Sequence, residues 1–139
     1  MASQRLLLCN CFASRKAARL ITKLYEDHLA GVNLTSTQFS ILVNVDDVGA
    51  ASMKDLVDTL VMERTSVVRA LQPLERDGLL VSGPDAADAR RNVVRLTDAG
   101  RARLAAAAPL WQAAQDEFER RFGSEVAGQL RQSAHGLEA

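Results

Sequence analysis

Residues 34–100 read LTSTQFSILVNVDDVGAASMKDLVDTLVMERTSVVRALQPLERDGLLVSGPDAADARRNVVRLTDAG, and this stretch decides the fold. Two hydroxyl residues in it mark helix starts. Thr35 stands three positions before Gln38, and Ser52 can offer its oxygen to the free amides of a second helix. Apolar residues follow both starts at helical spacing. They are Phe39, Ile41, Leu42 and Val45 after the first, and Met53, Leu56, Val57 and Leu60 after the second. The sequence therefore predicts two short helices that pack on each other.

A third helical segment, from Glu63 to Asp77, separates its two faces most clearly. At about 100° per residue, the apolar side chains fall within one narrow arc and the polar ones on the opposite side. The apolar set is Val67, Leu71 and Leu74, and the polar set is Thr65, Arg69, Gln72 and Arg76. Pro73 removes one backbone hydrogen bond and predicts a bend. Such a polar stripe can read DNA, and it is also typical of a solvated amphipathic helix.

Two β-like runs follow the third helix. They are residues 79–82 and 92–96, joined by a polar loop, 83–91, which starts with Gly-Pro and ends in Arg90 and Arg91. Two capped helices, an arginine-bearing helix and a hairpin with a basic loop are the layout of a winged helix-turn-helix. This layout predicts that the loop arginines enter a minor groove. The alternative is a mobile solvent loop in which Asp88 pairs with an arginine.

In a helix-turn-helix, the N-terminal end of the recognition helix meets base edges, and its amides suit phosphates. Arg64, Thr65 and Ser66 occupy that end of the third segment. The predicted DNA-binding residues are therefore Arg64, Thr65, Ser66, Arg69, Gln72, Arg76, Arg90 and Arg91.

The run KDLVDTLVMERTSVVRALQPLERDGLLVSGPDAADARRNVVRLTDAGR, residues 54–101, resembles the core of MarR-type transcriptional regulators. The family's wing carries an aspartate, one residue and an arginine, followed by an LT…GR junction from strand to helix. The matching residues are Asp88, Arg90, Leu96, Thr97, Gly100 and Arg101. The resemblance covers nearly the whole chain and implies a dimer that binds DNA. It departs at Val61-Met62-Glu63, where the family usually has Gly, an apolar residue and Asp, so the turn into the third helix is expected to differ slightly.

Both ends of the chain carry more apolar surface than the winged part can cover. The opening segment has an apolar stripe, and Leu104 to Phe118, beyond a cap at Thr97-Asp98, is alanine-rich and apolar on more than one side, with a bend expected at Pro109. The stripe is Phe12, Ala13, Ala17, Leu20, Ile21 and Leu24. A symmetric dimer with interlocked terminal helices provides this burial, and a monomeric helical cap is the alternative.

We therefore expect one domain per chain, residues 1–139, mainly α with a small β-hairpin wing (α+β). About 1–33 and 101–139 form dimerisation helices, and about 34–100 form the winged helix-turn-helix.

Composition excludes several other classes of protein. A net charge of zero weighs slightly against nucleic-acid binding, but residues 64–95 hold six arginines against four acidic residues. No apolar run approaches membrane-spanning length, and Leu6-Leu7-Leu8 is too short for a signal sequence, so we expect a cytoplasmic protein. The sequence shows no phosphate loop and no acid–base constellation, which predicts neither catalysis nor a cofactor. The Cys9–Cys11 spacing does not suit a zinc knuckle, so no metal is expected.

The cysteines bear on the regulatory signal. Within a helix, Cys9 and Cys11 would point about 200° apart, which prevents a ready disulfide. One interpretation is two small buried side chains. The other starts from CFASRKAARLITKLY, residues 11–25, which is similar to the opening helix of the organic-hydroperoxide-sensing MarR members. In that group a cysteine followed by Phe precedes a tyrosine at the position of Tyr25, and a second tyrosine stands where this chain has Arg15.

Geometry constrains this second interpretation. Fourteen residues of helix span about 21 Å, so Tyr25 can meet Cys11 only across a dimer. Arg15, one turn from Cys11, would favour its thiolate.

The sequence thus predicts a dimeric, sequence-specific regulator, a repressor at a pseudo-palindromic operator. Its predicted signal is a small aromatic or phenolic effector, bound in a crevice between the dimer helices and the winged part near Phe12, Phe39 and Trp111, unless these are plain core residues. The alternative is a thiol-based sensor of organic hydroperoxide. Its candidate residues are Cys9, Cys11, Phe12, Arg15 and Tyr25.

Overall fold

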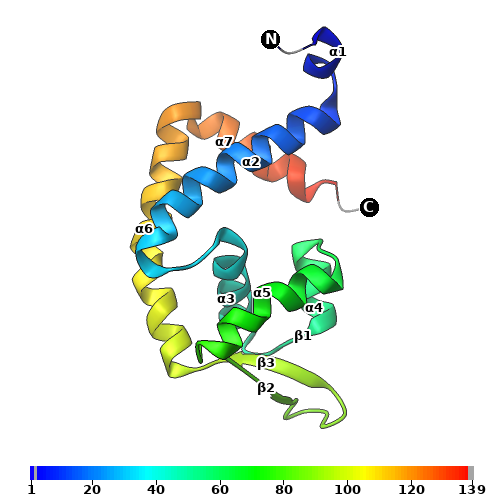
Figure 1. Cartoon of the computed structure of the whole chain (residues 1–139), viewed down its shortest axis with the longest axis vertical. Coiled ribbons are helices and arrows are strands. Elements are labelled where there is room, and N and C mark those ends of the chain that lie inside the picture. Colours follow the sequence, from blue (N-terminus) through cyan, green and yellow to red (C-terminus); the bar gives the residue numbers. More distant parts are fainter. Residues whose placement is uncertain (2, 138–139) are drawn as a thin grey trace. The chain divides into compact units, whose positions relative to one another are not determined.

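The computed structural model describes residues 1 and 3–137, which divide into two compact units (Figure 1). The winged unit comprises residues 30–109, and the helical unit comprises residues 1–29 and 110–139. Helix α6 (Asp98–Phe122) belongs to both, because the division falls after Pro109. None of the helices in the described part of the chain combines the length and the apolar character that a membrane crossing requires.

The winged unit contains the two helices that the capping pattern predicts and the third that the separation of its faces predicts. Helix α3 (Ser36–Val48) starts with a complete capping box: Thr35 Oγ1 accepts from the Gln38 amide at 3.1 Å, and Gln38 Oε1 accepts from the Thr35 amide at 3.0 Å. Helix α4 (Met53–Leu60) repeats the motif with Ser52 and Asp55, at 3.2 and 2.8 Å. Helix α5 (Arg64–Arg76) follows and contains Pro73.

The predicted apolar stripes form the core of this unit. Three helices and the sheet contribute fully or almost fully buried side chains, which provide most of the favourable free energy of folding. These residues are Ile41, Leu42, Val45, Leu56, Val67, Leu71, Leu74, Leu80, Val93, Val94 and Leu96.

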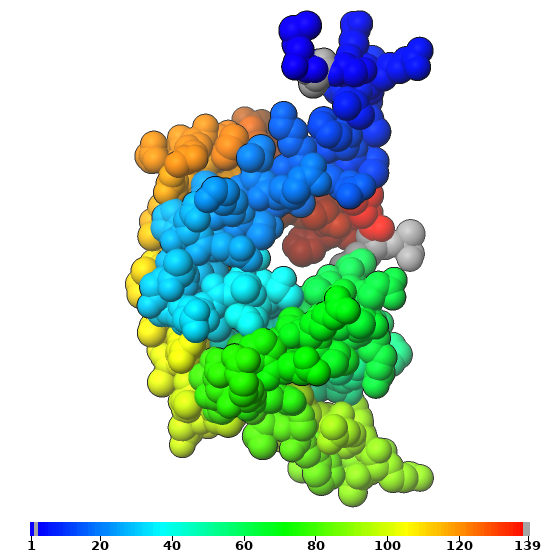
Figure 2. Space-filling model, in the orientation of Figure 1, coloured from blue at the N-terminus to red at the C-terminus, as the bar shows by residue number. Residues whose placement is uncertain are grey.

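A three-stranded antiparallel sheet completes the winged unit. Strands β2 (Leu80–Pro84) and β3 (Asn92–Leu96) form the predicted hairpin, which projects from the rest of this unit (Figure 2). Strand β1 (Ala51–Ser52) pairs with β3 on its other side, giving the order β1-β3-β2. The sequence did not predict β1, because a strand of two residues, the second of them the helix cap Ser52, is too short to show alternation. The predicted strand over 79–82 was one residue early at its start and two short at its end.

The end of α5 explains the later start of β2. Gly78 adopts φ +72°, a conformation that glycine tolerates best, and ends the helix in a Schellman motif. The Leu79 amide donates to Leu74 O at 2.9 Å, and the Gly78 amide donates to Glu75 O at 3.1 Å. Leu79 therefore belongs to the helix end and not to the strand.

Helices make up the helical unit: α1 (Gln4–Leu7), α2 (Asn10–Leu29), the second half of α6, and α7 (Ser124–His135). The Tyr25 hydroxyl donates to Gln115 Oε1, and His28 Nε2 lies 3.1 Å from Glu117 Oε2, so two polar pairs join α2 to α6. A short 3₁₀ turn (Ala30–Val32) leads from α2 into the winged unit.

Cys9 and Cys11 do not share a helix, so the angle of about 200° that a common helix would set does not apply to them. Helix α2 begins at Asn10, and Cys9 precedes it as a cap: its carbonyl accepts from the Ala13 amide at 2.9 Å, and its Sγ accepts from the Phe12 amide at 3.4 Å. In this chain Cys9 is half-buried and Cys11 is exposed. The interpretation of the pair as two buried side chains is therefore not supported by the chain on its own.

Candidate nucleic-acid interface

Helix α5 presents the predicted polar stripe to solvent. Val67, Leu71 and Leu74 turn into the core, while the predicted contact residues on this helix are all exposed. The exposed set is Arg64, Thr65, Ser66, Arg69, Gln72 and Arg76. Glu63, at the N-cap, makes no side-chain hydrogen bond to the first turn. The amides of Ser66 and Val67 donate to Glu63 O at 2.9 and 3.1 Å, and the amides that precede them keep their capacity to bind an anion.

The arginines of α5 differ in how far they are already engaged. Among the described residues, Arg64 and Arg69 form no ion pair, whereas Arg76 Nε lies 3.0 Å from Asp77 Oδ1. The Arg76 hydrogen bond holds the pKa of the Asp77 carboxyl below its ordinary value. Arg64 and Arg69 thus have the greater capacity for an external phosphate or base.

The wing loop presents Arg90 almost completely to solvent. Its side chain is 95% exposed, and only Nε, 3.4 Å from Asp88 Oδ1, is engaged within the described chain. The Arg90 amide also donates to Asp88 Oδ1 at 3.0 Å, which fixes the turn. The alternative interpretation expected such a pair between Asp88 and an arginine. An ion pair this exposed is weak, so it does not prevent the guanidinium from binding DNA.

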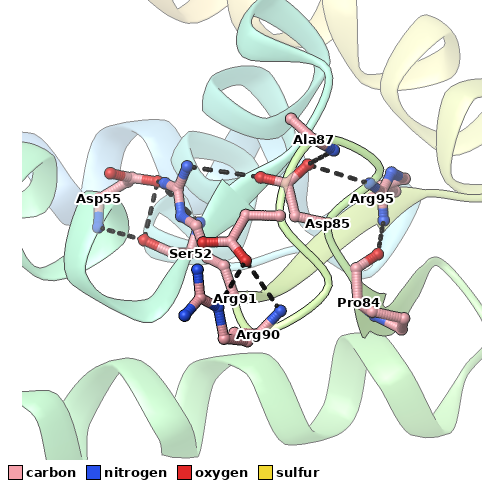
Figure 3. Close-up of polar contacts among 9 residues, drawn as sticks. Ser52, Asp55, Pro84, Asp85, Ala87, Arg90, Arg91 and Arg95 are labelled. Carbon is pink, nitrogen blue, oxygen red and sulfur yellow. Dashed lines mark hydrogen bonds and ion pairs between the residues drawn. The ribbon is translucent and has the colours of Figure 1, made fainter.

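Arg91 has a different environment from its neighbour (Figure 3). Its Nη2 donates to Asp55 Oδ2 of α4, and its Nη1 lies 3.5 Å from Asp85 Oδ2. Asp85 also faces Arg95, whose Nη2 is 3.8 Å from Asp85 Oδ1 and whose Nη1 donates to Pro84 O at 3.3 Å. The structure therefore gives Arg91, a predicted DNA contact, carboxylate partners in its own chain.

Asp55 stands at the centre of this cluster. Its Oδ2 accepts from the Ser52 amide and from the Ser52 hydroxyl, each at 2.8 Å, in addition to Arg91. The hydrogen bond from the Ser52 amide, with that from its hydroxyl, lowers the pKa of the Asp55 carboxyl, and Arg91 lowers it further. Asp55 is therefore ionised at neutral pH and is an acceptor for both helix cap and wing.

A groove of about 760 Å³ lies between α4, α5 and the hairpin. Arg64 and Gln72 line it from α5, and Arg91 lines it from the wing, so three of the predicted residues share one hollow. Sequence reasoning missed Asp55, Asp85 and Arg95. The capping motif showed Ser52, but no spacing signal connects Asp55 to a residue 36 positions away.

The predicted effector and redox residues are distributed over both units. In the helical unit, a hollow of about 350 Å³ is lined by Cys9, Cys11, Phe12, Arg15 and Arg19. Tyr25 lies fourteen residues after Cys11, and its hydroxyl donates to Gln115 and not to Cys11 of the same chain. Trp111 is half-buried in the helical unit and Phe39 is half-buried in the winged unit.

Comparison with known proteins identifies the family. The sequence model of the MarR family matches residues 32–91. The transcriptional regulator HosA of Escherichia coli is 30% identical over 115 residues, which are 79% of this chain and 85% of HosA. The chain belongs to the MarR family. The Gly position in the family's turn, held here by Val61, has the left-handed conformation that glycine favours, with φ 50° and ψ 49°.

Solved MarR-family structures share the whole architecture. A transcriptional repressor, CouR, bound to a 23-mer DNA duplex, superposes with a TM-score of 0.87 at 26% identity, covering 100% of this chain and 99% of that CouR chain. MosR of Mycobacterium tuberculosis, in complex with DNA, gives a TM-score of 0.72 at 34% identity, covering 94% of this chain and 99% of MosR.

Proposed function

We propose that this MarR-family regulator binds double-stranded DNA and represses transcription. Helix α5 enters the major groove, where Arg69 and Gln72 meet base edges while Arg64 and the first amides meet phosphates. Arg90 enters the neighbouring minor groove from the wing. The observation that carries this proposal is the exposed stripe of α5, with two arginines that form no ion pair among the described residues. The DNA-bound relatives CouR and MosR, both above 25% identity, support it.

The protein acts as a homodimer on a pseudo-palindromic operator. In the helical unit, large apolar side chains remain on the surface of the single chain: Leu20 is 61% exposed and Phe122 is 52% exposed. Val126 and Leu130, on α7, are 49% and 43% exposed. A second copy of the chain removes this surface from water at about 25 cal/mol per Å². Two-fold symmetry of the protein then requires two related half-sites in the DNA.

The predicted effector is a small aromatic or phenolic molecule that releases the protein from its operator. Phe12, Phe39 and Trp111 are all half-buried, so each keeps accessible ring surface. Such an effector releases the protein from DNA if it binds more tightly to a second conformation than to the DNA-bound one. In that second conformation, the two recognition helices of the dimer are wrongly spaced for the operator.

A thiol sensor is the second candidate, and the exposure of Cys11 favours it. Cys11 shares its hollow with two arginines, Arg15 and Arg19, so an oxidant reaches the sulfur in an electropositive setting. Organic hydroperoxide oxidises the thiolate to a sulfenic acid and is itself reduced to an alcohol. Cys11→Ser should then abolish the response to peroxide and retain basal DNA binding, whereas Cys9→Ser should have the smaller effect.

One experiment tests the proposed function. The purified protein selects from a pool of random duplex DNA at low salt, and the selection is repeated with organic hydroperoxide and with a panel of aromatic acids. Enrichment of a pseudo-palindromic sequence supports the proposal, and loss of enrichment under one condition identifies the signal. Failure to enrich any duplex sequence contradicts the proposed function.

A further inference from the structure

The side chain of Arg91 links the wing to the start of α4 (Figure 3). Its two terminal nitrogens reach two carboxylates, Asp55 on α4 and Asp85 on the wing. A guanidinium suits this task because its nitrogens form a rigid planar fork. The Arg91 side chain is 45% exposed, whereas that of Arg90 is 95% exposed. The two adjacent arginines therefore have different surroundings: the Arg91 side chain pairs with two carboxylates, and the Arg90 side chain lies in solvent.

The backbone around Arg91 transmits its position to the loop. Asp85 N donates to Arg91 O at 2.7 Å, and Arg91 N donates to Asp88 O at 2.9 Å, so Arg91 closes the loop from both sides. Residues 86–90 are thus held between hydrogen bonds to one residue. A displacement of the Arg91 side chain therefore also displaces Arg90.

The hairpin needs such a link. Beyond the buried ends of its strands, the hairpin is attached through the two residues of β1 and through the Ser82 hydroxyl of β2, which donates to Glu75 of α5. A two-stranded hairpin is only marginally stable by itself, so its outer end is free to move unless something holds it. Asp55 is a suitable anchor because the Ser52 capping box already fixes its carboxylate.

We propose that Arg91 is a positioning residue and not a DNA contact: held by Asp55 and Asp85, it sets the wing so that Arg90 meets the minor groove. This inference rests on the proposed DNA-binding function. The half-exposed ion pairs contribute little to global stability, so their effect concerns where Arg90 lies and not whether the unit folds.

The effect of Asp55→Asn on DNA affinity has one sign under this proposal and the opposite sign under electrostatics alone. Removal of an acidic charge near DNA should strengthen binding by electrostatics alone. The link predicts weaker binding, because Asp55→Asn removes the carboxylate charge that holds Arg91 and leaves only a weaker, neutral hydrogen bond. Asparagine keeps a side-chain oxygen for the Ser52 amide, so the helix cap survives the exchange.

The test measures affinity for a selected duplex against salt for four variants: Arg90→Gln, Arg91→Gln, the double variant, and Asp55→Asn. Arg90→Gln should make the slope of log affinity against log salt shallower by about 0.9, the value of one phosphate contact. Arg91→Gln and Asp55→Asn should each weaken binding about 5-fold, the scale of coupling between contacting residues. The double variant should bind about as weakly as Arg90→Gln alone.

Two results overturn the inference: a slope shallower by about 0.9 in Arg91→Gln with additive losses in the double variant, or tighter binding by Asp55→Asn. A second measurement needs no DNA. Amide hydrogen exchange of the free protein should be faster at Asp85 and Ala87 in Arg91→Gln and Asp55→Asn, but not in Arg90→Gln. Unchanged exchange there refutes the link itself, whereas a wild-type protein that binds no duplex refutes only the proposed function.

Discussion

Gly100→Ala is expected to destabilise the junction between β3 and α6 strongly. A Cβ at this position would lie 2.1 Å from the Leu79 carbonyl oxygen and 2.8 Å from Leu96 Cδ2, where ordinary contact begins at 3.4 Å. The nearest atom belongs to the backbone, so no side-chain rotation relieves the overlap. The Leu79 carbonyl is also occupied, because it accepts from the Thr97 amide at 3.1 Å and from Thr97 Oγ1 at 3.2 Å.

The magnitude follows from these contacts. Overpacking of a tight site costs about 1–3 kcal/mol, and displacement of the Leu79 carbonyl weakens hydrogen bonds worth about 1 kcal/mol each. Alanine is about 1 kcal/mol better than glycine inside a helix, which offsets part of the loss. We expect the free energy of unfolding to fall by about 2–4 kcal/mol.

Urea denaturation at fixed protein concentration, followed by circular dichroism, measures this change. The control is Gly128→Ala in α7, where an added Cβ meets no atom of its own chain within 4 Å. That variant should be as stable as the wild type or slightly more stable. A Gly100→Ala protein with wild-type stability would show that the Leu79 carbonyl does not approach Gly100 this closely.

The remaining predictions concern a strained turn, a titration and assembly. Val61→Gly should raise the free energy of unfolding by about 0.5–1 kcal/mol, because Val61 has φ 50° and is 78% exposed; Val48→Gly, at an exposed helical valine, should lower it. Burial raises the pKa of Tyr25, and Glu119 adds to the effect, so this single tyrosine should ionise above its ordinary value of about 10 in an absorbance titration. Since the folded pKa is the higher one, the associated stability is present below pH about 10 and is lost as the pH rises through the folded pKa; a tyrosine that titrates below 10 would contradict its burial. The protein should sediment as a dimer at micromolar concentration and Leu20→Asp should shift it towards monomer, whereas a stable wild-type monomer that binds one half-site tightly would exclude the proposed assembly.

Local sequence signals predicted the helices of the winged unit well. Thr35 and Ser52 accept the amides that the capping pattern assigns to them, and Val67, Leu71 and Leu74 lie in the core as their spacing predicts. These features depend on residues within one or two helical turns of each other. A single sequence records such short-range relations directly.

The features that the sequence did not predict depend on contacts between residues far apart in the chain or on an unusual N-cap residue. The Arg91–Asp55 contact joins two positions 36 residues apart, and β1 exists only because β3 lies beside it. The break before α2 escaped because Cys9, not one of the usual capping residues, supplies the acceptors for the first turn. The family resemblance supplied the LT…GR junction, and the structure gives its reason in the Thr97 hydrogen bonds and the space that Gly100 leaves for Leu79.

The DNA affinity of Arg69→Ala tests whether α5 reads the duplex. Fluorescence anisotropy with the selected duplex compares wild type, Arg69→Ala, and Arg120→Ala as a control on an exposed arginine outside the proposed interface. We expect Arg69→Ala to weaken binding by about 1–3 kcal/mol without a change in melting temperature, and Arg120→Ala to bind as the wild type does. Wild-type affinity in Arg69→Ala would remove this helix face from the interface and contradict the account.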